Sequence, residues 1–280
     1  MTKRSTVNAM EEQIGTKIGV LDHGFVCLID YMGCDEDIAK AARISYGADT
    51  NNCNVESLIH YLMANNHTSP FEMLEIKLMV KMPIFVARQW IRHRTANVNE
   101  QSARYTVLDQ SYYIPDTLRT QHTINKQGSL PLDADASAAL HDMDQHSIES
   151  YNLYKSLIES DNHVAREMAR IVLPLNYYTT MVWKIDLHNL FNFLSLRNDS
   201  HAQHEIQEYA KVIERIVQQW VPIAYGAYIA HRRNTSKIPN EVLATISSSL
   251  SEEQKSELKQ HILSSIHSKS ERIRLTNILC

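Results

Sequence analysis

Glycine is scarce in this 280-residue chain, which has seven glycines and none between Ala48 and Gln127. A dinucleotide-binding loop of the G-x-G-x-x-G type needs closely spaced glycines, because the backbone must approach the phosphates. The sequence therefore excludes a fold of that type. Any phosphorylated ligand has to be held by side chains and helix ends instead.

Cysteine and long apolar runs are also scarce. The four cysteines, Cys27, Cys34, Cys53 and Cys280, show no metal-ligand spacing. No run approaches the roughly 18 apolar residues of a membrane-spanning helix, and the N-terminus lacks the apolar run of a secretory signal. The net charge of -4 argues against general nucleic-acid binding, which needs a basic surface. We therefore expect a protein of the reducing cytoplasm with small phosphorylated partners, and neither a membrane nor a nucleic acid among them.

Apolar residues make up 44% of the chain, enough for a sizeable core. Alternating polarity predicts a strand over residues 74–82, and β-branched and aromatic residues predict another over 177–185. The apolar run over 25–29 predicts a buried strand. Helices are predicted over residues 35–46, 55–64, 84–94, 133–159, 163–173, 188–197 and 201–220. The last has a core face of Ile206, Tyr209, Ile213, Ile216 and Trp220. Strands separated by helical pairs predict one mixed α/β domain over residues 1–235, followed by a helical or partly disordered extension over 236–280.

Arginine is concentrated in one stretch of the chain. Across residues 82–108 the only acidic residue is Glu100. Four permanent positive charges lie there: Arg88, Arg92, Arg94 and Arg104. Guanidinium forks bind phosphate bidentately, so the stretch predicts a site for a phosphorylated ligand. The alternative is a solvated basic loop that pairs with acidic neighbours.

The arginine-rich stretch begins on the helix predicted over residues 84–94, for which Pro83 suits the first turn. Val86, Ala87, Trp90 and Ile91 form its apolar stripe, and Arg88, Gln89, Arg92 and His93 fall opposite. Asn97, Asn99, Glu100 and Ser102 then predict a loop. A guanidinium-rich helix face should therefore lie beside that loop.

An arginine ends the apolar stripe of the helix predicted over residues 188–197. Leu190, Phe193, Leu194 and Arg197 share one face at spacings of three and four. One interpretation is a helix-end residue that extends to solvent. The other is an arginine held in a dry pocket against an anion that forms on a substrate, where its charge stabilises most.

The spacing of the histidines is weaker evidence for a functional site than the arginines are. His201 and His204 lie three residues apart on a predicted helix, but such a pair is more often surface or packed histidine than a zinc site. His67 precedes a predicted strand in a turn-like segment and, alone, reads as a loop histidine.

Five segments together resemble the flavin-dependent thymidylate synthase family. The Arg92-His93-Arg94 triplet is followed after seven residues by Ser102, within Asn99-Glu100-Gln101-Ser102-Ala103-Arg104-Tyr105. Four others occur in the family's order: His67-Thr68-Ser69-Pro70-Phe71-Glu72, Pro83-Ile84-Phe85-Val86-Ala87-Arg88-Gln89-Trp90, Ala169-Arg170-Ile171-Val172-Leu173-Pro174 and Leu196-Arg197-Asn198-Asp199-Ser200-His201-Ala202-Gln203. The resemblance implies an α+β fold with a central, mainly antiparallel sheet flanked by helices.

The resemblance also implies an activity, which is the reductive methylation of deoxyuridylate (dUMP) to thymidylate (dTMP). FAD would be the hydride carrier, NADPH its reductant and methylenetetrahydrofolate the carbon donor, in a homotetramer with shared active sites. By analogy, dUMP is surrounded by Gln89, Trp90, Ile91, Arg92, Glu100, Gln101, Ser102, Ala103, Arg104, Arg170 and Arg197. FAD is contacted by Ser69, Arg92, His93, Arg94, Glu100, Asp186, Leu187, His188 and Asn192.

Three of these residues are expected to take part in the chemistry. Arg197 would face the uracil ring and activate it, and His67 would lie near the flavin and folate. Whether Ser102 bonds only the phosphate or also touches the carbon chemistry stays open. Arg170 should reach the site from another subunit. No cysteine lies between Asn54 and Leu279, so we expect catalysis without a cysteine nucleophile.

The sequence departs from the family at one place, where members commonly carry Asn-x-Arg and this chain has Asp186-Leu187-His188. A histidine makes the contact to FAD weaker and pH-dependent, and an aspartate near a phosphate is unfavourable unless it bonds a hydroxyl or a base edge. Two rival functions are a module that binds RNA or a phosphorylated signal without chemistry, and a metal-dependent hydrolase that uses His201 and His204.

Overall fold

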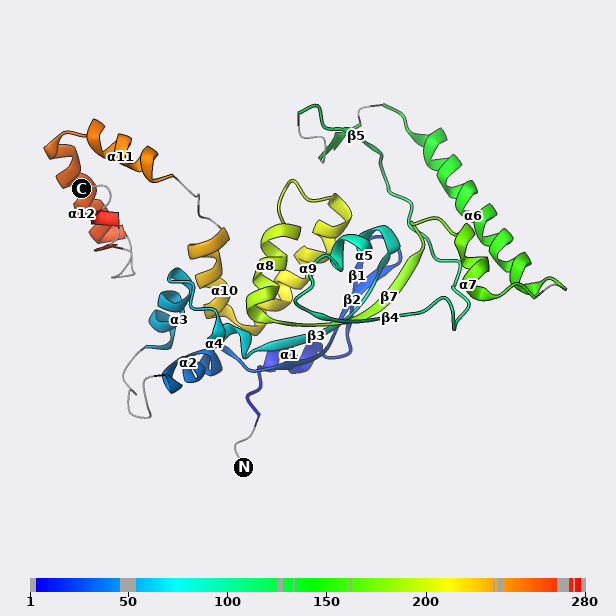
Figure 1. Ribbon diagram of the computed structural model, residues 1–280, viewed down its shortest axis with the longest axis horizontal. Helices are drawn as coiled ribbons and strands as arrows, with labels where there is room; N and C mark the ends of the chain where they lie inside the picture. The colour runs from blue at the N-terminus through cyan, green and yellow to red at the C-terminus, as the bar shows by residue number, and fades with distance from the viewer. Residues whose placement is uncertain are drawn as a thin grey trace. The chain divides into compact units, whose positions relative to one another are not determined.

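The computed structural model describes residues 4–45, 54–124, 128–132, 134–161, 163–233, 235, 239–265, 272–273 and 275–277 (Figure 1). The chain forms two compact units. The first, here called the sheet unit, comprises Met1–Met32 and Leu74–Trp220. The second, the helical unit, comprises Gly33–Met73 and Val221–Cys280.

A five-stranded antiparallel sheet is the centre of the sheet unit (Figure 1). Its order is β1 (Lys17–Val20), β2 (Gly24–Met32), β3 (Glu75–Pro83), β7 (Tyr178–Asp186) and β4 (Asn97–Glu100). The predicted strands over 25–29, 74–82 and 177–185 are confirmed. Side chains of β3 and β7 alternate between buried and half-buried, as expected for a strand with one core face. The mixed fold with a central antiparallel sheet is confirmed as well.

Helices α5 (Ile84–Trp90), α8 (Leu187–Arg197) and α9 (His204–Trp220) pack against this sheet. The predicted core face of α9 is confirmed, because all five of its residues are buried. The remaining elements of the unit are α1 (Asn8–Gln13), β5 (Arg119–Gln121), β6 (Ser129–Pro131), α6 (Ser137–Glu159), α7 (Arg166–Ala169) and η1 (Arg170–Val172). Strands β5 and β6 form a separate hairpin.

Helix α9 comes very close to the sheet at Gly24. A Cβ atom at this position would lie 2.0 Å from the Tyr209 hydroxyl and within 2.9 Å of two backbone carbonyl oxygens. The Tyr209 hydroxyl also donates to the Lys81 carbonyl oxygen over 2.8 Å. The hydrogen bond that joins α9 to β3 therefore depends on the absence of a side chain in β2.

Two predictions around the arginine-rich stretch are wrong. The helix predicted to reach Arg94 ends at Trp90, and Ile91, expected in its apolar stripe, is 45% exposed. Residues 97–100, expected in a loop, form β4 and pair with Lys184–Met181 of β7. Asn-Val-Asn-Glu has little intrinsic strand preference, so pairing with an existing sheet edge decides its conformation.

Other helix ends also differ from the predictions. The helix expected over 163–173 is reduced to α7 and the 3₁₀ turn η1, and α9 begins at His204 rather than at residue 201. Helix α6 begins at Ser137, and its expected first residue, Asp133, lies outside the described residues. Pro83 is the residue before α5 rather than part of its first turn. Helix ends fray and depend on local caps, which weakly amphipathic segments do not specify.

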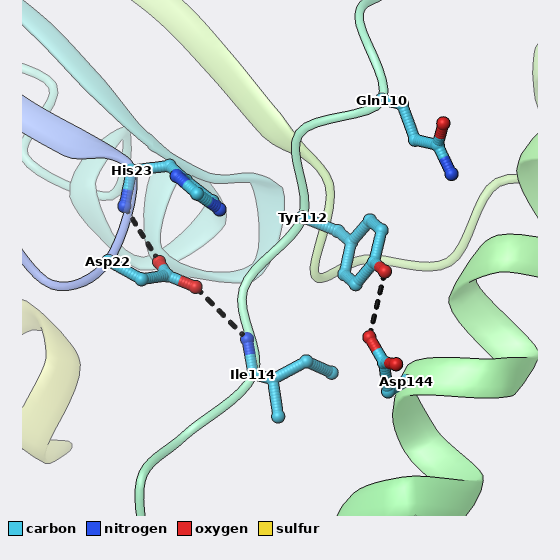
Figure 2. A pocket seen from close by; sticks show the side chains of 6 residues that line it. All are labelled: Asp22, His23, Gln110, Tyr112, Ile114 and Asp144. Carbon is cyan, nitrogen blue, oxygen red and sulfur yellow. Dashed lines mark hydrogen bonds between the residues drawn. The ribbon is translucent and has the colours of Figure 1, made fainter.

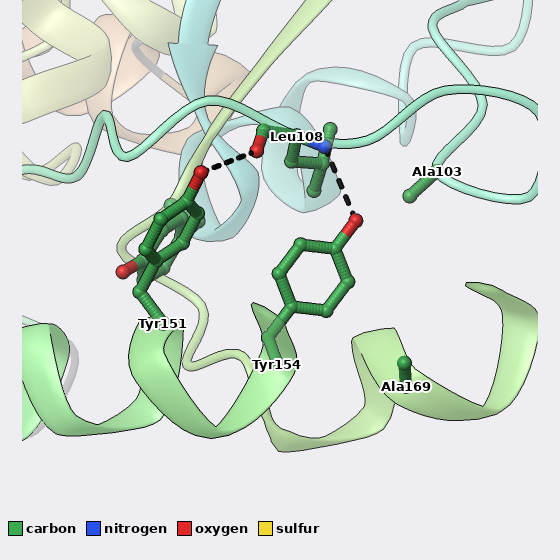
Figure 3. Close-up of a cluster of buried hydrophobic side chains, with 6 residues drawn as sticks. Ala103, Leu108, Tyr151, Tyr154 and Ala169 are labelled. Carbon is green, nitrogen blue, oxygen red and sulfur yellow. Dashed lines mark hydrogen bonds between the residues drawn. The ribbon is translucent and has the colours of Figure 1, made fainter. Parts of the chain in front are cut away.

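A second core cluster fixes the segment that follows β4 (Figure 3). It consists of Ala103, Leu108, Tyr151, Tyr154, Ala169 and Tyr177. The Tyr151 hydroxyl donates to the Leu108 carbonyl oxygen over 3.1 Å, and the Leu108 amide donates to the Tyr154 hydroxyl over 3.2 Å. Helices α6 and α7 thereby hold the chain next to Ser102 and Arg104.

The helical unit contains α2 (Asp35–Ile44), α3 (Val55–Ala64), α4 (Ser69–Glu72), α10 (Pro222–Tyr228), the π-helical turn η2 (Ile229–Arg233), α11 (Asn240–Ser249) and α12 (Glu252–Ser265). Asp35 is 5% exposed and accepts hydrogen bonds from the Ile223 and Ala224 amides, both over 2.9 Å. Asp35 thereby caps α10, because it accepts hydrogen bonds from two amides that have no partner within the helix. Helices α11 and α12 lie in the expected C-terminal extension over 236–280, which stays a prediction, and Tyr46, the expected end of α2, lies outside the described residues. No described helix combines the length and apolarity needed to cross a membrane.

Candidate functional site

The arginine cluster lies at the end of α5 and in the turn that follows. Arg88, Arg92 and Arg94 are exposed, and among the described residues their guanidinium groups make no ion pair or hydrogen bond. Arg170, at the start of η1, is equally exposed and unpaired within the described ranges. A solvated basic loop would pair with acidic neighbours, whereas these four guanidinium groups are available to an anionic ligand.

Arg197 is the last residue of α8 and is only partly exposed. Its Nη2 donates to the Gln89 carbonyl oxygen over 3.0 Å. Its Nε is buried and has no hydrogen-bond partner among the described residues. Burial lowers the pKa of Arg197. A helix-end arginine that merely extends to solvent would not bury a donor, so Arg197 does not behave as a purely solvent-exposed residue, and its contact with a substrate stays a prediction.

His93 lies beside Arg197. Its ring meets Phe193 edge-on with centroids 4.9 Å apart, and its Nε2 is buried without a partner in the described part of the chain. Burial and, second, the positive charge of Arg197 lower the pKa of His93 to about 4. His93 is therefore a neutral imidazole at neutral pH, and it does not compete with Arg197 for an anion.

The segment from Glu100 to Arg104 is held by the sheet on one side and by a tight turn on the other. The Glu100 carboxylate accepts from the Thr179 hydroxyl over 2.7 Å, and the Gln101 amide donates to the Thr180 carbonyl oxygen over 2.8 Å. The Ser102 Oγ accepts from the Arg104 amide over 3.3 Å. Ser102 and Arg104 are thus brought into one turn.

Two residues of this region that were predicted to contact dUMP have contacts within the protein instead. Ala103 is buried in the second core cluster, so only its backbone can face a ligand. Arg104 pairs with Glu167 over 3.2 Å, with both side chains about half exposed. An exposed ion pair contributes only about 0.2–1 kcal/mol, so a phosphate can replace Glu167 on this guanidinium.

Trp90 belongs to the core. Its ring is fully buried and lies 4.7 Å from Phe193 and 5.2 Å from Trp183, measured between centroids. The indole cannot line a ligand site, so a contact from this position has to come from the backbone. Neighbouring Gln89, by contrast, donates from Nε2 to the Gln203 Oε1.

The start of α8 carries the segment that departs from the family. Asp186 caps this helix, accepting from the Asn189 amide over 2.9 Å and from its side-chain Nδ2 over 2.7 Å. Leu187 is fully buried. His188 and Asn192 are within 3.4 Å of each other on a more exposed face. The Asp186 carboxylate therefore caps the helix and is not available to a ligand. His188 and Asn192 are the side chains of this segment best placed to contact one.

His67 and Ser69 belong to the helical unit. His67 is exposed, follows Asn66 in the left-handed region (φ 56°), and packs edge-on against Tyr61 at 5.7 Å between centroids. Ser69 is the first residue of α4. Their approach to the arginine cluster stays a prediction.

A hollow of about 310 Å³ in the sheet unit is lined by residues that the sequence did not single out (Figure 2). They are Asp22, His23, Gln110, Tyr112, Ile114 and Asp144. Asp22 accepts from the His23 and Ile114 amides, and Asp144 accepts from the Tyr112 hydroxyl over 2.8 Å. Two carboxylates and no arginine make this hollow unsuited to phosphate.

The two described cysteines do not resemble nucleophiles. Cys27 is buried in β2, and burial together with Glu36 and Asp37 raises the pKa of the Cys34 thiol to about 11. Cys53 and Cys280 lie outside the described residues. His201 pairs with Asp199 over 2.8 Å, and His204 lies 3.7 Å from Glu208. Among the described residues no group of three or more histidine, cysteine or acidic side chains could hold a metal ion.

The sequence did not identify the structural roles of Phe193 and Gln203. Phe193 supports the His93 ring, and its position one turn before Arg197 was the available signal. Gln203 bonds Gln89 across the sequence, and nothing local in the sequence marks that contact.

Comparison with known proteins identifies the family. Residues 27–223 match the family model described as thymidylate synthase complementing protein. The flavin-dependent thymidylate synthase of Anaplasma marginale (strain St. Maries) is 48% identical over 250 residues, covering 88% of this chain and 85% of that protein. The protein of the same name from Wolbachia pipientis wMel is 51% identical over 235 residues, covering 82% of each.

A solved structure agrees with these relatives. A UMP/dUMP methylase from Streptomyces cacaoi, bound with 5-Br dUMP, superposes with a TM-score of 0.70 at 31% identity. The match covers 77% of this chain and 99% of that chain. The fold of this chain is thus shared with a solved structure. The chain belongs to the flavin-dependent thymidylate synthase family.

Proposed function

We propose that this enzyme converts dUMP to dTMP, with methylenetetrahydrofolate as the carbon donor, NADPH as the reductant and FAD as the bound flavin. The observation that carries the proposal is the half-buried Arg197, with an unpaired Nε, beside a turn of unpaired arginines. The names of the relatives support a flavin and thymidylate synthesis, and the Streptomyces cacaoi structure supports a uridylate substrate.

The arginine cluster suits the diphosphate of FAD, because Arg92 and Arg94 are exposed and unpaired among the described residues. Further contacts to FAD are proposed from His93, which is neutral, and from the side chains of His188, Asn192, Ser69 and Glu100 and the backbone of Leu187. Asp186 is proposed only as the residue that orients this helix end. When bound, FAD supplies the hydride chemistry that amino-acid side chains lack.

The proposed dUMP site uses the remaining residues. Arg104 and Ser102 bind the phosphate, together with Arg170 of another subunit. Gln89, the backbone of Trp90 and Ile91, and the segment from Glu100 to Ala103 line the nucleotide, with His67 near the flavin and folate. Arg197 faces the oxygen and N3 edge of uracil. A cation at that edge favours the ionised, more nucleophilic ring and can lower such a pKa by about one to three units.

Direct measurement of thymidylate tests the proposal. The purified protein should be yellow, and dTMP should form only when dUMP, methylenetetrahydrofolate and NADPH are all supplied. Flavin-loaded protein that forms no dTMP would contradict the reaction. Salt-sensitive retention of RNA without bound flavin would favour the module that binds RNA or a phosphorylated signal. Loss of a hydrolytic activity on adding a chelator would favour the metal-dependent hydrolase.

Arg92→Ala and Arg94→Ala should each weaken FAD binding, because each change removes a charge-assisted hydrogen bond of about 1.5–3 kcal/mol. Flavin content and FAD titration of the apoprotein measure the effect. Arg215→Ala, which removes an exposed arginine of α9, is the matched control and should retain wild-type affinity. Unchanged affinity in both test variants would remove these residues from the proposed cofactor site.

The proposed homotetramer predicts complementation between inactive subunits. Arg170 is exposed and unpaired among the described residues, as a residue that acts across a subunit boundary would be. Mixing Arg170→Ala subunits with Arg197→Ala subunits should restore part of the activity, because some sites then contain both arginines. Verified mixed tetramers without recovered activity would count against a shared site.

We also propose a cytoplasmic location and one catalytic domain over residues 1–235. That range includes the whole sheet unit and the family segment His67–Glu72 of the helical unit. The proposed boundary falls within the helical unit, after η2 and before α11 and α12.

A further inference from the structure

Glu205 is a buried carboxylate near the start of α9. Only 2% of the residue is exposed, although glutamate is rarely buried without a partner. Burial alone would raise its pKa, but its own backbone amide, Arg119 and the Gln203 side chain outweigh that effect and lower it. Glu205 is therefore an anion at neutral pH. Its Oε1 receives the donors, whereas its Oε2 is buried without a hydrogen-bond partner among the described residues.

Two distant segments supply donors to Glu205. Arg119 at the start of β5 places Nη2 2.5 Å from Oε1, and the Tyr113 hydroxyl donates to the same oxygen over 3.2 Å. Arg119 is mostly buried as well, with 25% of its side chain exposed. This pair attaches the β5–β6 hairpin to the start of α9.

The chain between Arg197 and Glu205 has little apolar anchoring. Glu205 is the first buried residue after Leu194, and the residues from Asp199 to His204 are exposed except for half-buried Ala202. At the other end of this loop, Asn198 bonds to Glu214 of α9. The position of Gln203 is therefore set mainly from the α9 side, where Glu205 is fixed by Arg119.

Gln203 connects this anchor to the candidate site. Its Oε1 accepts a hydrogen bond from the Gln89 side chain, and the Gln89 carbonyl oxygen accepts from Arg197. Polar contacts thus join Arg119 to Glu205, and Gln203 through Gln89 to Arg197. The two sets are linked by the chain itself, because Gln203 precedes Glu205 by two residues at the start of α9. No residue of the hairpin itself has to touch the substrate.

We propose that Arg119 is a positioning residue for dUMP binding, which acts through Glu205 and Gln203 on the Gln89–Arg197 pair. The inference rests on the proposed function, since dUMP is the ligand that it concerns. A purely structural ion pair would fasten the hairpin and stabilise the fold without changing nucleotide affinity. Positioning predicts that affinity for dUMP changes in protein that is still folded and flavin-loaded.

The test is a titration of flavin-loaded protein with dUMP, followed by the change in flavin absorbance, together with steady-state kinetics. Arg119→Leu should weaken dUMP binding and raise KM about tenfold, as expected for misplacing one or two hydrogen bonds, with a smaller change in kcat. Arg119→Lys, which keeps the charge, should recover part of the affinity. Gln203→Leu should give a similar loss, and the double variant should lose no more than either single variant, because both act on one contact.

Lys211→Leu is the matched control, since it breaks an exposed ion pair of the same helix with Glu208 and should bind dUMP like wild type. Equal FAD content and circular dichroism establish that the variants are folded. If Arg119→Leu does not fold, the isosteric Glu205→Gln carries the test, with an expected loss of roughly fivefold.

Three outcomes would overturn the inference. Affinity of the folded Arg119→Leu or Glu205→Gln variant within about twofold of wild type would mean that the ion pair is structural only. Additive losses in the double variant would mean that Arg119 and Gln203 act separately. A wild-type protein that binds no dUMP would remove the proposed function, and this inference with it.

Discussion

Replacing Arg197 with lysine should give a folded, flavin-loaded enzyme whose turnover falls about a hundredfold, corresponding to roughly 2.7 kcal/mol of barrier. The guanidinium uses Nη2 on the Gln89 carbonyl oxygen and still holds a buried, unpaired Nε in the same plane. Lysine keeps the positive charge but offers a single ammonium without the planar fork, so it cannot both bond the carbonyl oxygen and hold a second donor in the fixed plane that the proposed contact with uracil needs.

Single-turnover and steady-state rates of dTMP formation, normalised to bound FAD, measure this effect. Arg215→Lys makes the same chemical change at an exposed position of α9 and should leave the rate unchanged. Turnover of Arg197→Lys within about twofold of wild type, less than roughly 0.4 kcal/mol, would mean that the planar fork has no activating role.

Trp90→Ala should destabilise the protein by about 3–5 kcal/mol, because it empties a fully buried site between two sheet-facing helices. The indole contacts Trp183, Phe193 and Tyr209, which lie on β7, α8 and α9. Denaturant unfolding, monitored by circular dichroism at fixed FAD concentration, gives the loss in free energy of unfolding.

Trp90→Phe is the informative companion to that variant. The Trp90 Nε1 has no hydrogen-bond partner among the described residues, so phenylalanine removes volume but no polar contact. We expect a smaller loss of stability and nearly normal dUMP affinity. A Trp90→Phe protein of normal stability that binds dUMP poorly would show that the indole itself contacts the nucleotide, contrary to its burial.

Long elements with a clear period could be predicted from the sequence. Strands β3 and β7 and helix α9 each combine a regular polar pattern with a single buried face, so local pattern and tertiary packing agree. Strand β4 could not be predicted, because Asn97, Asn99 and Glu100 favour turns and are drawn into a strand only by the free edge of β7.

The site was predictable to the extent that its chemistry is local. Arg92, Arg94, Ser102 and Arg104 lie in one short stretch of the chain, and Arg197 interrupts an apolar stripe, so composition and spacing single out both as candidates. The contact of Gln89 with Gln203 joins positions 114 residues apart, and that of Arg119 with Glu205 joins positions 86 residues apart. Such pairs depend on how the elements pack, which no local pattern records.

The close approach at Gly24 has a consequence for how freely this sequence can change. In a mutational library, position 24 should admit almost nothing but glycine, since even alanine would collide with the Tyr209 hydroxyl and two carbonyl oxygens. Accommodating a methyl group would mean moving α9, and the start of that helix carries Glu205. Gly24 thus sets the distance between the sheet and α9, and the start of α9 is joined to the loop that follows Arg197. A substitution at Gly24 should therefore displace that loop as well as the sheet contact.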